Sequence, residues 1–227
     1  MPFLILARHG RTTANAAGIL AGRSEGVGLD GYGKDQAQAA AERLADVTIA
    51  RTISSPMQRC LETAGLLVPG TTVEIDERLT ECDYGDWTGG ALAELAKEPL
   101  WRTVQRQPSA AVFPSGESMS QMSARAVEAA RSLSRDVAEA HGEHAVWLAV
   151  SHGDIIKAIL ADALGMHLDS FQRISVNPGS LSLVHYGRHR ASVLAMNTVA
   201  GPLPIPQIVT DDAAVGGAPD ATLGSPT

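Results

Sequence analysis

The sequence has little of what secreted, membrane-spanning and nucleic-acid-binding proteins need. Its 227 residues include two cysteines, Cys60 and Cys82, which are too few for the disulfide framework of a small secreted domain. No apolar run approaches the roughly 20 residues that cross a bilayer. Arg8 and His9 interrupt the apolar N-terminus before a signal-peptide core forms. We therefore expect a cytoplasmic protein with no membrane partner.

Positive charge is also scarce. The chain has 18 Lys and Arg residues against 25 Asp and Glu residues, a net charge of −7. Binding to a phosphate backbone requires a basic surface, so we expect no nucleic-acid partner. Cations that bind an anion must then be concentrated at one place. The composition, 44% hydrophobic and 19% charged, is ordinary for a globular chain, and the length favours one large α/β domain.

A buried strand with a reactive end opens the chain. The apolar run from Phe3 to Ala7 is typical of a buried parallel strand, and it ends abruptly in Arg8-His9-Gly10. Ligands of open α/β sheets bind beyond the carboxyl ends of the strands, which is where Arg8 and His9 fall. Gly10 lacks a Cβ and would let backbone amides approach a ligand. The alternative is a core strand followed by an ordinary surface turn.

The same pattern returns later in the chain. Residues 145–150 are a second apolar run, which ends in Ser151-His152-Gly153 and is followed by a predicted helix over 154–164. If the two strands are neighbours in a parallel sheet, His9 and His152 lie in one crevice.

A third predicted strand, over 48–53, precedes a candidate anion site. Ser54-Ser55-Pro56 is typical of a helix start with a serine cap, and the helix is predicted from Met57 to residue 67. This places Arg59 in the first turn, where free amides and the helix dipole also favour an anion.

The remaining elements follow from periodicity and turn residues. We predict helices over 30–44 and 119–141 and strands over 72–75, 182–185 and 193–197, with a polar loop at 76–89 that contains Glu81. Residues 89–118 are irregular and are interpreted as a lid insertion over the site. Beyond Gly201 the composition predicts a flexible Pro/Gly/Ala-rich tail. The catalytic domain is thus expected over 1–200 and the tail over 201–227.

Five side chains form a consistent chemical set: Arg8, His9, Arg59, Glu81 and His152. A neutral imidazole is a competent nucleophile toward phosphorus, and arginine forks match phosphoryl oxygens. A carboxylic acid can protonate the leaving oxygen and then, as carboxylate, take a proton from water. A metal site is a weaker interpretation, because the arginines would repel a cation. We expect no metal and no cofactor.

Several short segments, in chain order, match the motifs of a known family. They are Arg8 to Asn15, Leu29 to Ala37, Ser54 to Arg59 with Thr63-Ala64, Leu79 to Glu81 with Gly85 and Gly89, Pro114 to Ser118, and Ser151 to Gly153. In these segments the sequence resembles the histidine phosphatase superfamily, in its cofactor-dependent phosphoglycerate-mutase-like branch and of the broad-specificity phosphatase type.

The resemblance implies a three-layer α/β/α fold with a mostly parallel central sheet and a phosphohistidine intermediate on His9. It also implies phosphate contacts from Arg8, Arg59 and His152, with Glu81 as the proton donor. Thr12, Asn15 and Gly153 match positions that line the phosphate pocket. For Thr12 and Asn15 the alternative is that they cap the turn after Gly10.

The segment after the acid separates two activities. Residues 89–118 do not look like the longer segment with which phosphoglycerate mutases shield the phosphoenzyme from water. We therefore expect a metal-independent phosphomonoester hydrolase acting on a small phosphorylated metabolite, with a phosphomutase or a non-catalytic phosphate-binding module as alternatives. A homodimer is plausible from the resemblance alone.

Two further features have a structural and a functional interpretation. Glu117 precedes the long helix and is interpreted as part of its cap rather than as a catalytic group. Apolar residues near the insertion either line a substrate wall or form the core of a small helical cap, and we favour the core. They are Trp87, Leu95, Trp101, Val104 and Phe113.

Overall fold

The computed structural model describes residues 2–201 and 216. The predicted tail beyond Gly201 therefore lies, apart from Gly216, outside the described residues, and the domain boundary at residue 200 stays a prediction. Within the described residues, no helix combines the length and the apolar character needed to cross a membrane.

Six strands form one sheet in the order β3-β2-β4-β1-β5-β6. The pairs β1·β4, β2·β4 and β2·β3 are parallel, and β5 runs antiparallel to both β1 and β6. The sheet is therefore mostly parallel, as predicted. The strands are β1 (Phe3–Arg8), β2 (Ile49–Ser54), β3 (Val73–Ile75), β4 (Val146–Ser151), β5 (Leu181–Tyr186) and β6 (Ala191–Thr198).

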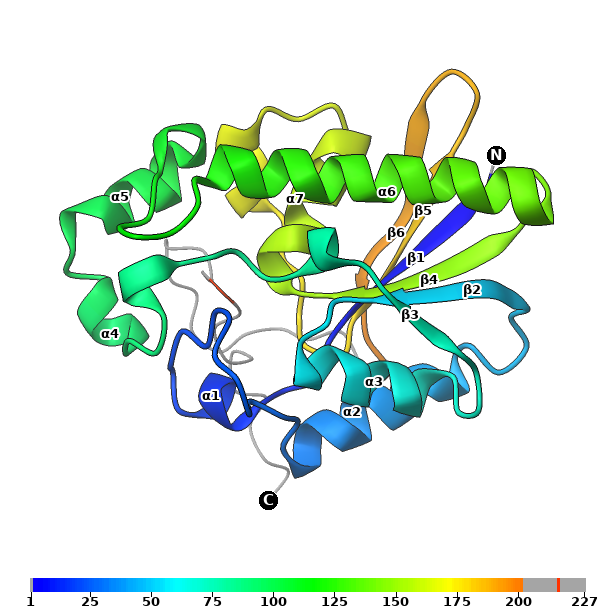
Figure 1. Cartoon of the computed structure of the whole chain (residues 1–227), viewed down its shortest axis with the longest axis horizontal. Helices are drawn as coiled ribbons and strands as arrows, with labels where there is room; N and C mark the ends of the chain where they lie inside the picture. Colours follow the sequence, from blue (N-terminus) through cyan, green and yellow to red (C-terminus); the bar gives the residue numbers. More distant parts are fainter. Residues whose placement is uncertain (1, 202–215, 217–227) are drawn as a thin grey trace.

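Helices cover both faces of the sheet and complete the three layers. In Figure 1, α2 (Gly31–Glu42) and α3 (Gln58–Leu67) lie below the sheet, whereas α6 (Met119–His141) and α7 (Gly153–Ala163) lie above it. Leu4 and Leu6 of β1 belong to one buried cluster with residues of α6 and α7. Ile5 and Ala7 belong to the second cluster, with residues of α3. Both faces of β1 are buried, which explains why its sequence is apolar throughout instead of alternating.

The long helix α6 has the bounds that its periodicity predicts. Ser118 is the N-cap and forms a capping box with Gln121, and Gly142 follows the last turn with a φ of 95°. The side chains spaced by three and four residues are fully or almost fully buried in the main core. They are Met119, Met122, Ala126, Ala130, Leu133 and Val137.

Short helices make up the segment between Glu81 and α6. They are α4 (Leu92–Leu95), α5 (Pro99–Arg106) and the 3₁₀ turns η2 (Gly85–Trp87) and η3 (Pro108–Ala110). Three other short helices lie elsewhere in the chain: α1 (Thr13–Ala16) after β1, η1 (Glu77–Leu79) before Glu81 and η4 (Leu168–Arg173) after α7. The Trp87 ring lies 6.2 Å from that of Trp101 and 5.3 Å from that of Phe113, centroid to centroid. Val104 and Phe113 are buried in the main core. The apolar residues of this segment thus pack with one another, as the core interpretation expects.

Candidate active site

The two histidines lie side by side because their strands are neighbours. Arg8 of β1 pairs with Ser151 of β4, and the backbone N–H of His9 donates to the Ser151 carbonyl at 3.0 Å. The ring centroids of His9 and His152 are 5.3 Å apart, with the rings inclined at 64°. The repeated strand-His-Gly pattern therefore does bring both imidazoles to one place at the carboxyl edge of the sheet.

A backbone hydrogen bond fixes the tautomer of His9. Its Nδ1 lies 2.7 Å from the carbonyl oxygen of Gly10, which can only accept, so Nδ1 carries the hydrogen. Nε2 is left with its lone pair. Burial, Arg59 and Arg8, in that order, hold the pKa of His9 well below its usual value. The ring is consequently neutral near pH 7, which is the form that can act as a nucleophile.

Two buried arginines lie next to the histidines. Arg59 lies in the first turn of α3, as predicted. Its Nη2 donates to the Gly22 carbonyl at 2.7 Å and lies 3.2 Å from Nδ1 of His152. Its Nη1 is buried and makes no hydrogen bond within the described residues. Arg8 ends β1 and donates through Nη1 to the Val176 carbonyl. The two guanidinium groups concentrate positive charge at this edge of an otherwise acidic protein.

Glu81 follows η1 and completes the set. Its Oε1 accepts the backbone N–H of Cys82 at 2.9 Å, and its Oε2 lies 3.9 Å from Nδ1 of His152. Burial raises the pKa of the Glu81 carboxyl to about 7, and the nearby Asp154 carboxylate adds to the rise. A carboxyl group with this pKa can both donate and accept a proton near neutrality.

The loop that carries Glu81 is held by an ionic cluster that the sequence did not reveal. Arg23 Nε and Arg125 Nη2 donate to the Glu81 carbonyl at 2.9 and 3.1 Å. Glu117 pairs with both arginines and accepts the Asp83 N–H at 2.9 Å. The prediction that Glu117 caps α6 is therefore wrong: Ser118 is the cap, and Glu117 holds the acid loop. No local signal marks Arg125, which is one of three arginines on α6.

The N-terminus of α3 differs from its prediction. Its N-cap residue is Met57, with no side-chain cap, so neither serine caps the helix. Instead, Ser55 Oγ lies 2.7 Å from Nε2 of His152. His152 is fully buried at the N-cap position of α7, and burial with Arg59 keeps its pKa well below the usual value.

The glycine after His9 is required for a different reason than predicted. The Gly10 N–H donates to Thr63 Oγ1 at 3.2 Å, so the amide is already engaged. A Cβ at Gly10 would collide with the carbonyl oxygen of Gly33. The lack of a side chain thus permits close packing of loop on helix rather than approach of a ligand. Thr63 also donates to the Arg59 carbonyl at 2.7 Å and so ties the His9 loop to α3.

The predicted pocket residues after β1 are engaged with each other. Thr12 and Asn15 form a capping box at the start of α1, with Asn15 N–H donating to Thr12 Oγ1 at 3.1 Å and Thr12 N–H to Asn15 Oδ1 at 3.1 Å. This is the capping alternative; a phosphate contact from either residue stays a prediction. Gly153 begins α7 against the Arg8 guanidinium, since a Cβ there would lie 3.6 Å from Cζ.

The family follows from comparison with known proteins. The model of the histidine phosphatase superfamily (branch 1) matches residues 4–199. The chain belongs to this superfamily. It is 32% identical over 191 residues to the glucosyl-3-phosphoglycerate phosphatase of Mycolicibacterium vanbaalenii, covering 82% of this chain and 84% of that protein.

Two further relatives bear on the function of this histidine phosphatase. A probable phosphoglycerate mutase, GpmB of Proteus mirabilis, is 32% identical over 186 residues, covering 80% of this chain and 83% of that protein. The native structure of a mycobacterial glucosyl-3-phosphoglycerate phosphatase superposes with a TM-score of 0.74 at 27% identity, covering 86% of this chain and 98% of that one. Family and fold are therefore those implied by the sequence motifs.

The two cysteines are free and buried. Cys60 Sγ lies 3.5 Å from Nε2 of His152, and burial raises the pKa of the Cys60 thiol to about 12. Burial also raises the pKa of Cys82. Both thiols are therefore protonated at neutral pH and act as small buried side chains.

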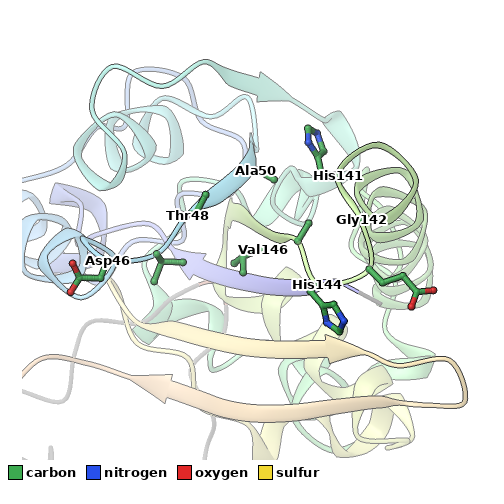
Figure 2. Close-up of a pocket in the computed structure, with 10 residues that line it drawn as sticks. Asp46, Thr48, Ala50, His141, Gly142, His144 and Val146 are labelled. Atoms are coloured by element: carbon green, nitrogen blue, oxygen red, sulfur yellow. The ribbon is translucent and has the colours of Figure 1, made fainter.

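A pocket of about 880 Å³ lies at the opposite end of the sheet, where β2 and β4 begin. Figure 2 shows His141 and His144 on its rim with their rings pointing in different directions. None of its ten lining residues belongs to the candidate site. Nowhere in the described part of the chain do three His, Cys, Asp or Glu side chains gather as possible metal ligands.

Proposed function

We propose that this histidine phosphatase hydrolyses phosphate monoesters through a phosphohistidine on Nε2 of His9. The observation that carries the proposal is the hydrogen bond from His9 Nδ1 to the Gly10 carbonyl. It leaves an unprotonated nitrogen on a neutral ring, beside two buried arginines and a carboxyl group whose pKa is near 7. These are the groups that nucleophilic phosphoryl transfer needs.

In the first step the Nε2 lone pair of His9 attacks phosphorus, and the bond from phosphorus to the ester oxygen breaks. Protonated Glu81 gives its proton to that oxygen, so the alcohol leaves neutral. Arg8, Arg59 and His152 hold the phosphoryl oxygens. The buried Nη1 of Arg59 supports this assignment, because a buried donor requires an acceptor and a phosphoryl oxygen supplies one.

In the second step water attacks the phosphohistidine. The Glu81 carboxylate takes a proton from the water, the bond from nitrogen to phosphorus breaks, and inorganic phosphate leaves. Glu81 and His9 return to their starting protonation states. The positive charge at the phosphoryl group comes from the arginines, so we expect the reaction to proceed without an added metal ion.

The substrate class is a small phosphorylated metabolite. The similarity to a glucosyl-3-phosphoglycerate phosphatase supports a small phosphate ester as substrate. The similarity to a probable phosphoglycerate mutase makes phosphoryl transfer between two positions of a substrate the second candidate activity. The two activities differ in whether water or a second alcohol accepts the phosphoryl group. A lid function for residues 89–118, a homodimer and a cytoplasmic location remain predictions.

Hydrolysis of an aryl phosphate in excess chelator tests the proposal. Wild type and His144→Ala should be active, because His144 is exposed at the far end of the sheet. His9→Ala should be inactive while it remains folded. Activity in folded His9→Ala would refute the nucleophile. If wild type interconverts phosphoglycerates faster than it hydrolyses them, the mutase candidate replaces the hydrolase.

A further inference from the structure

The residues that follow three neighbouring strands stand in one row. Ser55 follows β2, His152 follows β4 and His9 follows β1, and these strands are adjacent in the sheet. The Ser55 N–H donates to the Val150 carbonyl at 2.9 Å, which fixes the serine beside the end of β4. Ser55 is fully buried, and its hydroxyl lies 2.7 Å from Nε2 of His152.

The two nitrogens of His152 face different surroundings. Nδ1 faces the catalytic groups, 3.2 Å from Arg59 Nη2 and 3.9 Å from Glu81 Oε2. Nε2 faces away from them, toward the Ser55 hydroxyl and the Cys60 thiol. Arginine can only donate, so in this structure Nδ1 accepts and Nε2 carries the hydrogen that is donated to Ser55.

Binding of a phosphoryl group imposes the opposite arrangement. A phosphoryl oxygen accepts hydrogen bonds, so a contact from Nδ1 needs a hydrogen on Nδ1. Burial, followed by Arg59 and the other basic groups nearby, disfavours a doubly protonated ring. His152 must then hold its one hydrogen on Nδ1 and accept a hydrogen bond at the buried Nε2, because an unpaired buried nitrogen is costly.

We propose that Ser55 is a positioning residue that supports both tautomers of His152 and thereby lets a neutral imidazole donate to the phosphoryl group. The inference rests on the proposed function. A hydroxyl both accepts and donates, so Ser55 accepts from Nε2–H before binding and donates to Nε2 after it. The exchange is balanced: Nδ1 takes one proton from water and Nε2 releases one to water.

Nitrogen-15 NMR of the histidine side chains tests the proposal on the full-length protein. Spectra are recorded without and with saturating inorganic phosphate, and the His152 signals are those absent from His152→Gln. Wild-type His152 should change from the Nε2–H to the Nδ1–H tautomer. In the phosphate complex its Nε2 should show the upfield shift of a nitrogen that accepts a hydrogen bond.

Ser55→Ala and Ser54→Ala form the matched pair. Ser54 is equally buried one residue earlier, and its hydroxyl donates to the Ser55 carbonyl rather than to a histidine. Ser55→Ala should lose the upfield shift of Nε2 and weaken phosphate binding about tenfold, the usual effect of one hydrogen bond. Ser54→Ala should retain the wild-type spectrum and affinity.

The outcomes separate the two proposals. If phosphate perturbs the His9 signals but wild-type His152 keeps the Nε2–H tautomer, the role of Ser55 is refuted and the proposed function stands. An unchanged Nε2 shift in Ser55→Ala also refutes it. If phosphate perturbs neither histidine, the proposed function fails and the role of Ser55 fails with it. The wild-type spectra decide even if Ser55→Ala does not fold.

Discussion

The pKa of Glu81 predicts how the first chemical step depends on pH. With a pKa of about 7, the carboxyl group is protonated in roughly nine-tenths of molecules at pH 6 and in roughly one-tenth at pH 8. Only the protonated form can donate to the leaving oxygen. For an alkyl phosphate, kcat/KM should therefore fall about tenfold between these two pH values. The pKa of His9 is lowered, so the nucleophile stays neutral between pH 6 and pH 8. Its titration therefore does not contribute to the change of kcat/KM with pH in this range.

The leaving group identifies the titrating residue. An aryl phosphate with an acidic phenol needs little protonation of its leaving oxygen, so its kcat/KM should decline much less between pH 6 and pH 8. Glu81→Gln should lower kcat/KM for the alkyl ester by about 10² to 10⁴, the usual contribution of a general acid, and for the aryl ester far less. The steady-state assay is phosphate release with each substrate from pH 5 to pH 9.

Glu81→Gln also supplies the control. Phosphate monoesters themselves ionise near pH 6, and the variant displays that ionisation alone. The ratio of wild-type to variant kcat/KM then isolates the carboxyl group. If the alkyl-to-aryl ratio of wild type does not change with pH, or if Glu81→Gln slows both esters equally, Glu81 is not the proton donor.

Three further predictions concern the groups around the acid. Arg59→Ala should lower aryl phosphate kcat/KM about 10²-fold, or roughly 3 kcal/mol, because it removes a preorganised donor. The control Arg51→Ala, which removes a partly exposed ion pair with Glu74, should leave kcat/KM unchanged. Equal losses in both variants would refute the assignment of Arg59 as a phosphoryl contact. Glu81→Gln should also alter stability. A carboxyl group raised from 4.5 to about 7 contributes stability below pH 4.5 that is lost as pH rises through 7, by at most ~3 kcal/mol. In urea unfolding, the free energy of unfolding of the variant relative to wild type should therefore be higher at pH 9 than at pH 5. The same difference at both pH values would contradict the raised pKa of Glu81. Glu117→Ala should lower alkyl ester kcat/KM several-fold, because it loosens the loop that carries Glu81. Glu128→Ala, on the exposed face of α6, should leave kcat/KM unchanged. Equal effects of the two substitutions would show that the ionic cluster around Glu117 does not position Glu81.

The strands and their reactive ends could be predicted from the sequence because the physics is local. A parallel strand covered by helices on both faces is apolar at every position, and β1 and β4 meet this condition. The first polar residue after such a run marks the edge of the sheet. His9 and His152 could therefore be placed at one edge without knowledge of the strand order.

The ionic cluster and the role of Ser55 could not be predicted, because they depend on which strands and helices become neighbours. The residues Ser54-Ser55-Pro56 are typical of a helix N-terminus, and nothing in the neighbouring sequence shows that Ser55 pairs with the end of β4 instead. Arg125 reaches the Glu81 carbonyl from 44 positions along the chain. Such contacts arise from the packing of α6 over the sheet, and helix periodicity shows only which face of α6 is buried.

The strand-His-Gly pattern occurs twice, but the two histidines differ because Nδ1 of His9 and Nε2 of His152 contact different partners. The His9 Nδ1 faces a carbonyl, which can only accept, so its hydrogen is held there and Nε2 keeps a permanent lone pair. The His152 Nε2 faces a hydroxyl, which accepts or donates. A fixed tautomer suits a nucleophile, because its lone pair must be available whenever substrate binds. An exchangeable tautomer suits a binding group, which contacts Arg59 before the phosphoryl group arrives and donates to that group afterwards.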